Sequence, residues 1–370
     1  MGNMLDYLDW RGDLSFAQSP FNEVDNLILS QLAYVNFEGI VPPRGNDESI
    51  SIKDAAEFYF KMYEEETIMN FGFLIRISVP LLKKLGESNR FGNARLSQYV
   101  NIIDLDEQKQ FSAIHITLSD ETIFVAFRGT DNTIVGWKEN FNMSFMMPVP
   151  AQLEAVRYLN ETVRGYDTKL RIGGHSKGGN LAIFASVMCQ SQIKANILEV
   201  YNNDGPGFNR EMTESKEYKE VLSRMKTIVP ESSVVGMLLE HEEDYYVVKS
   251  SKTGFMQHDA MTWEVLGKGF VHVGHVTQES KLLDVTLKAW VNRMDKEQRE
   301  QFVDAIAYVF HAANIESLDD LSRSKWKKAS EMLIVINHMA PEHKEVLTKT
   351  LKLLFDEGRR VYKEAKSKGD

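Results

Sequence analysis

The sequence predicts an α/β protein in which a mostly parallel sheet is flanked by helices and followed by a helical appendage. Between residues 106 and 280, short β-rich runs alternate with apolar helical stretches, a pattern typical of a parallel sheet covered on both faces. Residues 1–105 have mostly helical patterning, and residues 281–366 have it throughout. We therefore expect one domain over residues 1–280 and a helical appendage over residues 281–370.

The N-terminal part is expected to contribute helices to this domain. Apolar residues recur at helical spacing over Phe21–Val35, which indicates an amphipathic helix. A second helix is expected over Ala55–Tyr63, and the run Pro42–Asp47 between them, with two prolines and a glycine, is typical of a loop.

The strands of the sheet are expected further along the chain. Phe111–Leu118 and Thr122–Phe127 are β-rich and are separated by three polar residues, so they predict an antiparallel hairpin. The other expected strands are Leu170–Ile172, Ile197–Tyr201, Met225–Val229 and Tyr245–Val248, and the helices between strands are Ala151–Tyr158 and Gly178–Met188.

The appendage carries no chemical motif. Asp295 is placed to cap a helix that runs through Phe302 and Phe310, and two more helices are expected over Trp326–His338 and Pro341–Ala365. We expect these helices to pack against the domain or against a second subunit, so a homo-oligomer is one possible arrangement.

Composition excludes several classes of partner. The net charge is −10, from 53 acidic and 43 basic residues, whereas a nucleic-acid-binding surface needs the opposite balance.

Cys189 is the only cysteine, so an internal disulfide is ruled out. No apolar stretch is long enough to span a bilayer, and the N-terminus lacks the basic and apolar regions of a secretory signal. We expect a cytoplasmic protein that binds no nucleic acid and has no transmembrane segment.

The motif that predicts chemistry is Gly174-His175-Ser176-Lys177-Gly178. A strand candidate precedes it and an apolar helix follows it, and in this context the serine lies on a sharp turn above the sheet edge. The N-terminus of the next helix then faces the charge that develops on a carbonyl oxygen. A phosphate-binding loop is disfavoured because the G-x-x-x-x-G-K-[S/T] pattern is absent. Ser176 is the predicted nucleophile.

A nucleophilic serine of this kind requires an oxyanion hole, usually made of two backbone N–H groups. The first is the N–H of Lys177, and the second is expected from Thr130, which follows the strand that ends at Phe127. Gly129 would permit an unusual backbone there. The alternative is an ordinary turn with Arg128 in a structural ion pair. The side chain of Lys177 is expected either to attract an anionic substrate or to point into solvent.

These residues carry a family resemblance. Phe127-Arg-Gly-Thr130, the later Trp137 and Gly174-His-Ser-x-Gly-Gly resemble the paired signatures of class 3 lipases. The chain resembles more closely an uncharacterised bacterial family of α/β-hydrolase-like proteins. The stretches that carry this second resemblance are Phe127–Asp131, Gly136–Met143, Gly174–Asn180, Tyr201–Gly207 and Gln257–Asp259 with Trp263. Over about residues 5–275, the resemblance implies the α/β-hydrolase fold and lipase-like ester hydrolysis.

The catalytic acid is expected between the serine and the histidine in chain order. Asp204 is the first candidate because it follows the strand that ends at Tyr201, and this fold places chemistry at the carboxyl ends of its strands. Class 3 lipases take the acid one strand later, but Val229–Val234 holds a serine at the aligned position. Glu231 in that segment is the fallback acid. The alternative role of Asp204 is that of a turn residue bonded to its own backbone.

His258 is the expected general base. It follows the strand Tyr245–Val248 and a glycine-containing loop, where the last catalytic residue of this fold arrives. His272 and His275 lie further on and alternate as in a strand. His175 is adjacent to the serine, but its side chain is expected to point into the fold, away from the base.

The sequence thus predicts a serine esterase, similar to lipases, that acts through an acyl-enzyme on Ser176. The expected substrate is a small-molecule or lipid ester. No cofactor or metal is expected, since no His-Glu-x-x-His pattern is present. Two alternatives stay open: a catalytically silent protein that keeps the fold for binding or assembly, and a hydrolase of thioesters or peptides.

Overall fold

The computed structural model describes most of the chain. The described residues are 1–64, 73–104, 106, 107, 109–130, 138, 139, 142, 143, 147–165, 167–313, 315 and 325–369. Trp137 and half of the Gly136–Met143 stretch therefore lie outside the described residues.

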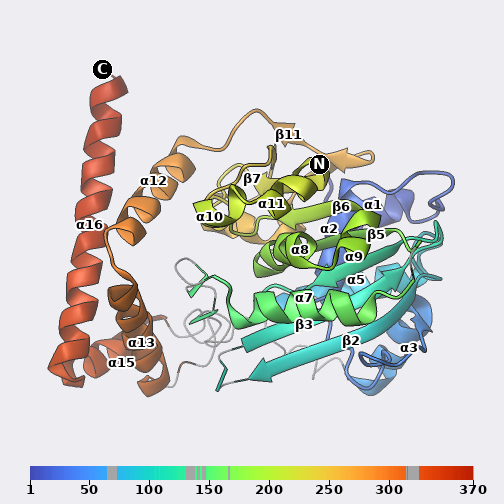
Figure 1. Ribbon diagram of the computed structural model, residues 1–370, viewed down its shortest axis with the longest axis horizontal. Helices are drawn as coiled ribbons and strands as arrows, with labels where there is room; N and C mark the ends of the chain where they lie inside the picture. Colours follow the sequence, from blue (N-terminus) through green and yellow to red (C-terminus); the bar gives the residue numbers. More distant parts are fainter. Residues whose placement is uncertain are drawn as a thin grey trace.

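A twisted sheet forms the centre of the molecule (Figure 1). Within the described residues it has nine strands in the order β1-β2-β3-β4-β5-β6-β7-β8-β11. The five consecutive strands β4 to β8 are parallel, and the flanking strands pair antiparallel on both sides. The strands are β1 Ile50–Ser51, β2 Arg95–Asp104, β3 Lys109–Thr117, β4 Ile123–Phe127, β5 Leu170–His175, β6 Ile197–Asn203, β7 Met225–Pro230, β8 Tyr245–Val248 and β11 His272–Val273. The predicted α/β fold class and the β3–β4 hairpin are confirmed.

Helices cover both faces of this sheet. One face packs against α1 Met4–Arg11, α2 Glu23–Leu32, α3 Ile52–Met62 and α5 Phe73–Glu87. The other face packs against α7 Pro150–Thr162, α8 Lys177–Met188, α9 Ser191–Asn196 and α11 Lys216–Val221. Shorter elements are α10 Arg210–Thr213, the 3₁₀ turns η1 Leu222–Arg224, η2 Gly254–His258 and η3 Ala260–Thr262, and the hairpin of β9 Val265–Leu266 with β10 Gly269–Phe270.

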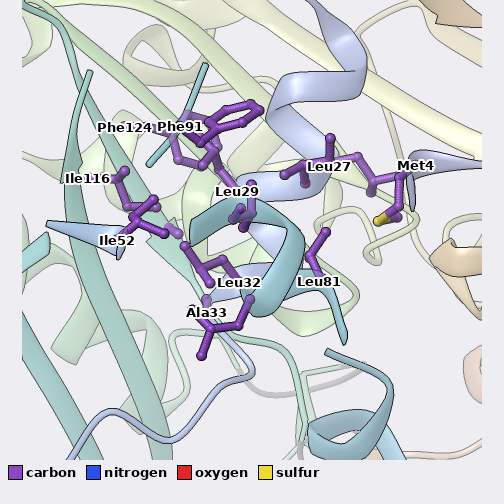
Figure 2. Close-up of a cluster of buried hydrophobic side chains, with 14 of the residues drawn as sticks. Met4, Leu27, Leu29, Leu32, Ala33, Ile52, Leu81, Phe91, Ile116 and Phe124 are labelled. Carbon is purple, nitrogen blue, oxygen red and sulfur yellow. The ribbon is translucent and has the colours of Figure 1, made fainter. Parts of the chain in front are cut away.

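Strand β4 shows how the sequence divides the core in two. Its side chains alternate between the faces: Phe124 and Ala126 pack in the cluster on the side of α2, whereas Val125 and Phe127 pack in the cluster beneath α7 and α8. Figure 2 shows the first cluster, in which Leu29 of α2 lies among side chains from the sheet and from α5. Both faces of the strand are therefore buried, which explains its continuous apolar sequence.

The prediction of a mostly helical N-terminal part was wrong for β2, a ten-residue strand within residues 1–105. The register against β3 shifts between Ser97 and Val100, and Gln98 has a positive φ of 56°. This bulge inserts one extra residue into the strand. It therefore breaks the strict alternation by which a half-buried strand is recognised in sequence.

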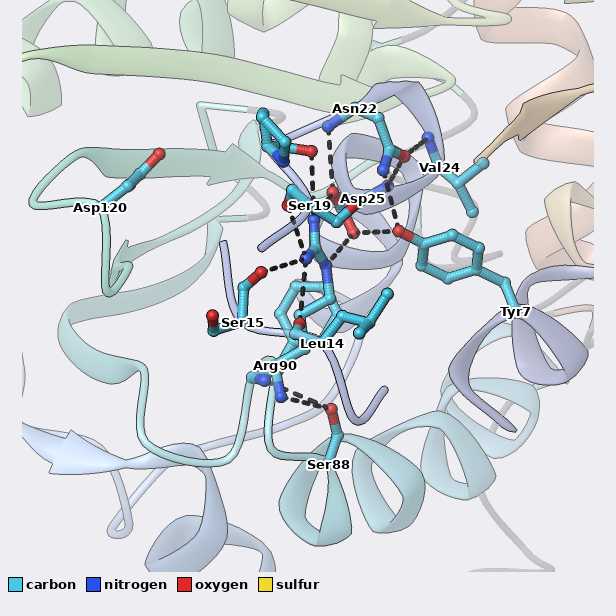
Figure 3. Close-up of polar contacts among 12 residues, drawn as sticks. Tyr7, Leu14, Ser15, Ser19, Asn22, Val24, Asp25, Ser88, Arg90 and Asp120 are labelled. Atoms are coloured by element: carbon cyan, nitrogen blue, oxygen red, sulfur yellow. Dashed lines mark hydrogen bonds and ion pairs between the residues drawn. The ribbon is translucent and has the colours of Figure 1, made fainter. Parts of the chain in front are cut away.

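A buried ion pair joins α2 to the segment between α5 and β2 (Figure 3). Arg90 donates from Nε to Asp25 Oδ1 at 2.8 Å and from Nη2 to Asp25 Oδ2 at 2.5 Å, and both side chains are fully buried. The guanidinium also donates to four backbone carbonyls, those of Leu14, Ser15, Ser19 and Pro20. Tyr7 OH donates to Asp25 as well. One arginine thus fixes the loop between α1 and α2.

The appendage contains its own small core. Its helices are α12 Gln278–Asn292, α13 Lys296–Ala312, α15 Lys325–His338 and α16 Pro341–Gly369. Trp290, Phe302 and Leu347 are buried among them, and Asp295 caps α13 as predicted. In Figure 1 the long α16 lies at one end of the molecule and α3 lies at the other. Among the described residues, no helix combines the length and apolar character that a bilayer crossing requires.

Contacts between the appendage and the sheet domain include one hydrogen bond and one ion pair. Ser280, in the first turn of α12, donates from its hydroxyl to the backbone carbonyl of Ser233. Asp304 of α13 forms an ion pair with Lys138 at 2.7 Å. Both partners in the domain lie in segments that follow strands of the sheet.

His115, on β3, makes stability depend on pH. It is fully buried beside Thr162, and burial lowers the pKa of its imidazole from 6.5 to about 3. Between these values the unfolded chain binds a proton that the folded protein does not bind, so stability falls as the pH falls. The loss is about 1.4 kcal/mol per pH unit. We expect His115→Gln to flatten this slope, measured by urea denaturation at pH 7, 5.5 and 4.5. Parallel stability curves for the wild type and the variant would contradict the assignment.

Candidate active site

Ser176 lies on a strained turn between β5 and α8. Its φ of 57° and ψ of −132° lie in a region that non-glycine residues rarely adopt. The turn also requires close backbone approach, because a Cβ atom at Gly178 would lie 2.1 Å from the carbonyl oxygen of Phe127. The serine is almost fully buried, and its N–H donates to Asn203 O at 2.9 Å. This is the geometry that the Gly-x-Ser-x-Gly motif predicts.

His258 and Asp204 complete a hydrogen-bonded set with this serine. His258 Nε2 lies 3.0 Å from Ser176 Oγ, and His258 Nδ1 lies 2.6 Å from Asp204 Oδ2. Because a carboxylate only accepts hydrogen bonds, Nδ1 carries the proton and Nε2 is free to accept one from the serine hydroxyl. The three residues come from the ends of β5 and β6 and from η2. The structure therefore brings together the three side chains that the sequence nominated.

The Asp204 carboxylate bonds to His258 and to the segment after β7. It follows β6, has a φ of 53°, and is completely buried. Its second oxygen, Oδ1, accepts from Ser233 Oγ at 2.5 Å and from Gly236 N–H at 3.1 Å. Asp204 occupies the contact with His258 Nδ1, so the fallback acid Glu231 takes no part in it. The Glu231 backbone instead bonds to Val248 O and to Thr277 N–H.

The turn after Asp204 is held by amide side chains. Asn180, the last residue of the serine motif, donates to the carbonyls of Pro206 at 3.0 Å and of Gly207 at 2.9 Å. Asn202 accepts from Gly205 N–H through its side chain at 2.9 Å. These buried contacts explain why asparagines accompany the serine and acid motifs, and they fix the acid relative to the nucleophile.

His175 supports the base, which corrects the expectation that it points away from it. Its Nε2–H donates to the backbone carbonyl of His258 at 2.8 Å, and the two rings are 4.7 Å apart. Burial, together with the nearby His258, holds the pKa of His175 well below its usual value. The ring is therefore neutral, and its Nδ1 accepts from Tyr34 OH at 3.2 Å. Sequence gave no signal for this contact beyond the position of His175 in the motif.

The His258 loop is also fixed from the other side. Trp263 is fully buried and donates from its indole N–H to Gln257 O at 2.8 Å. The Gln257 side chain accepts from Ser232 N–H at 2.7 Å and donates to Lys252 O at 2.8 Å. Gln257 and Trp263 thus hold the backbone of the loop that carries His258.

The two expected oxyanion donors lie on segments that touch the nucleophile. Lys177 is the first residue of α8, a position whose N–H has no partner within the helix. Gly129, just before Thr130, is packed so closely that a Cβ atom would lie 2.5 Å from His175 O and 3.2 Å from Ser176 Cβ. Its φ is not among the positive values. Gly129 is therefore needed for space and not, as expected, for an unusual backbone.

The side chain of Lys177 differs from both expectations, because it faces neither substrate nor solvent. It is 1% exposed and its ammonium group lies 2.8 Å from Glu139 Oε2, which is also 1% exposed. The pairing of Glu139 with Lys177 was not predicted from the sequence, because Glu139 lies in a stretch without helix or strand patterning. Arg128 donates to Asn101 at 3.0 Å.

The described residues contain no cluster of three or more His, Cys, Asp or Glu side chains arranged to hold a metal ion.

The fold and the site define an α/β-hydrolase-like protein: a parallel sheet, a strained serine turn at its carboxyl edge, and a histidine and an aspartate in hydrogen-bond contact with the serine. Within this class the chain belongs to the Mbeg1-like family, whose sequence model matches residues 85–308, more than half of the chain.

Solved structures show weaker likeness. The crystal structure of M37 lipase is 16% identical over 57% of this chain and 68% of that chain, with a TM-score of 0.35. A fungal lipase in complex with an inhibitor is 13% identical over 54% of this chain and 82% of that chain, with a TM-score of 0.31. No curated protein matches the chain closely enough to count as a relative.

Proposed function

We propose that this protein is a serine hydrolase that cleaves carboxylic esters through an acyl-enzyme on Ser176. The observation that supports the proposal is the continuous hydrogen-bonded line from Asp204 through His258 to Ser176, with distances of 2.6 and 3.0 Å. A serine, its base and an orienting acid within such distances match the requirements of nucleophilic catalysis. The strained backbone of Ser176 is a second support, since strain of this kind persists where function requires it.

The proposed reaction has two halves. His258 Nε2 takes the proton of Ser176 Oγ while Oγ attacks the carbonyl carbon, and the resulting oxyanion is bound by the N–H groups of Lys177 and Thr130. The alcohol leaves with the proton from His258. Water then attacks the acyl-enzyme by the same route, which releases the acid and regenerates the serine. Asp204 keeps the imidazole oriented.

The resemblance of the Phe-Arg-Gly-Thr and Gly-His-Ser-x-Gly-Gly stretches to class 3 lipases favours esters as substrates over peptides. A catalytically silent role fits less well, because a protein that had lost its chemistry would have no need to keep Asp204 buried against His258.

A fluorophosphonate probe tests the proposal directly. We expect the purified full-length chain to be labelled, and Ser176→Ala and His258→Ala to remain unlabelled. Asp259→Asn, next to the base, is the matched control and should label like the wild type. A panel of p-nitrophenyl esters of increasing chain length, a thioester and an anilide then ranks the substrate classes. A folded wild type that is unlabelled in buffer, in detergent and with lipid vesicles would overturn the proposal.

A further inference from the structure

Lys177, directly after the nucleophile, buries a charged group that the proposed reaction does not use. Its ammonium nitrogen lies 2.7 Å from Gln110 O, 3.2 Å from Gln110 Oε1 and 2.8 Å from Glu139 Oε2. An ammonium group has three N–H donors, so each donor has one acceptor. The side chain thus has an acceptor for every hydrogen bond that an ammonium group can donate.

Glu139 is equally well satisfied, and its partners come from separate elements. Oε2 accepts from Lys177 at the start of α8 and from the N–H of Gln110 on β3 at 3.2 Å. Oε1 accepts from the N–H of Ala151, in the first turn of α7, at 2.9 Å. One carboxylate therefore joins the beginnings of two helices and the beginning of a strand.

Stability alone is a poor reason for this arrangement. Taking two charges out of water costs several kcal/mol per ion, and well-packed apolar residues of similar volume often stabilise a protein as much or more. What such a pair does provide is a fixed geometry. The relevant question is therefore what lies at the two ends of the Lys177–Glu139 pair.

Both ends lead to the oxyanion hole. The backbone N–H of Lys177 is one expected donor. The other, Thr130, comes two residues after Arg128, whose N–H donates to Ser112 O on β3 at 2.9 Å. Gln110 lies two residues before Ser112 on the same strand and bonds to both Lys177 and Glu139. The ion pair thus holds the start of α8 against the strand to which the segment of the second donor is bonded.

We propose that Lys177 and Glu139 form a positioning pair that sets the distance between the two oxyanion donors. The pair touches neither substrate nor reacting atoms, and the inference rests on the proposed function of the site. Oxyanion donors act only where they lie 2.7–3.1 Å from the developing charge, and a displacement of about 1 Å is enough to cost on the order of 100-fold in rate. Loss of the pair therefore acts on kcat and leaves KM nearly unchanged.

The test compares three variants on a p-nitrophenyl ester. Lys177→Met removes the cation, and we expect kcat to fall about 10- to 100-fold with KM within about twofold. Lys138→Met is the matched control: it removes the ion pair of the adjacent residue with Asp304, on the solvent side of the same segment, and should keep wild-type kcat. The pH profile of kcat/KM should be unchanged in Lys177→Met, because the base and the acid are intact.

The double variant Lys177→Met/Glu139→Gln separates positioning from the cost of a lone buried charge. It leaves no unpaired ion, so its melting temperature should exceed that of Lys177→Met. If the pair positions the hole, kcat stays low in the double variant. Recovery of kcat together with stability would overturn the proposal, because the pair would then be needed only for charge balance.

Inhibition by a phenylboronic acid gives a second readout. Its tetrahedral adduct on Ser176 places an oxygen where the oxyanion forms, so its Ki should rise by the factor by which kcat falls. If Lys177→Met has the same Ki for the boronic acid as the wild type, or the same kcat, the positioning role is overturned. The proposed function is unaffected by that result, because the wild type is still active. A wild type that hydrolyses no ester and binds no boronic acid would instead overturn the proposed function.

Discussion

Replacing Asp204 with Asn is expected to lower kcat by about four orders of magnitude while the protein stays folded. An asparagine side chain fits the same space and can still accept from Ser233 Oγ and Gly236 N–H, which now bond to Oδ1. It cannot hold Nδ1–H of His258 as a carboxylate does, so the imidazole is no longer fixed in the tautomer that accepts the serine proton. Loss of the orienting acid in this way costs about 10⁴ in kcat.

The measurement is kcat on a p-nitrophenyl ester, with Ser176→Ala as the baseline and circular dichroism to verify folding. Asp259→Asn changes a neighbouring carboxyl that caps η3 and should retain most of the activity. An Asp204→Asn enzyme within tenfold of the wild type would show that this aspartate is a turn residue only.

Ser233 supports Asp204 from the neighbouring strand. It lies in the segment after β7, and its hydroxyl bonds to Asp204 Oδ1. The acid is thus supplied from the end of β6 and supported from the end of β7. An exchange tests this relation: Asp204→Gly/Ser233→Asp should exceed Asp204→Gly in kcat by at least about tenfold, since glycine accepts the positive φ at position 204. Equal rates would mean that position 233 cannot serve as the acid.

The strands of the sheet could be predicted where their sequences follow a regular apolar pattern. Strands β4 to β8 are short apolar runs, and helices separate β4, β5, β6 and β7 from one another. Ser176 and Asp204 directly follow the ends of β5 and β6. Strand β2 was not predictable, because the bulge at Gln98 interrupts its alternation. A regular pattern of apolar residues identifies a helix or a strand from its own sequence. An irregular strand such as β2 is recognised only from the strand with which it pairs, and a short stretch of sequence does not contain that partner.

The supporting contacts of the site were missed for a different reason. A lysine after the nucleophile is normally assigned to solvent, because lysine is almost never buried unless paired. Its partner Glu139 is 38 residues away in the chain. The contact of His175 with the His258 carbonyl spans 83 residues. Residue type and spacing nominate the reacting groups, whereas the groups that orient them are fixed only by tertiary packing.

The largest effect on stability is expected from Arg90→Met, which should lower the free energy of unfolding by about 3–5 kcal/mol at pH 7. The variant leaves Asp25 fully buried without its cationic partner (Figure 3). It also removes the donor to the four carbonyls between Leu14 and Pro20. Urea denaturation followed by circular dichroism measures the loss. Arg95→Met, on the exposed side of β2, is the matched control and should cost less than about 1 kcal/mol.

The pH dependence of this loss identifies its cause. Burial raises the pKa of Asp25, and Arg90 is the main group that lowers it. The pKa of Asp25 is raised even with Arg90 in place, and without Arg90 it rises further. A carboxyl of this kind contributes stability that is fully present below about pH 4 and is lost as the pH rises, and the loss is larger in the variant. The deficit of Arg90→Met relative to wild type should therefore shrink between pH 7 and pH 5. A deficit independent of pH would assign the effect to the lost carbonyl contacts and cavity instead. The double variant Arg90→Met/Asp25→Leu, which carries no buried charge, should recover part of the stability in the first case and none in the second.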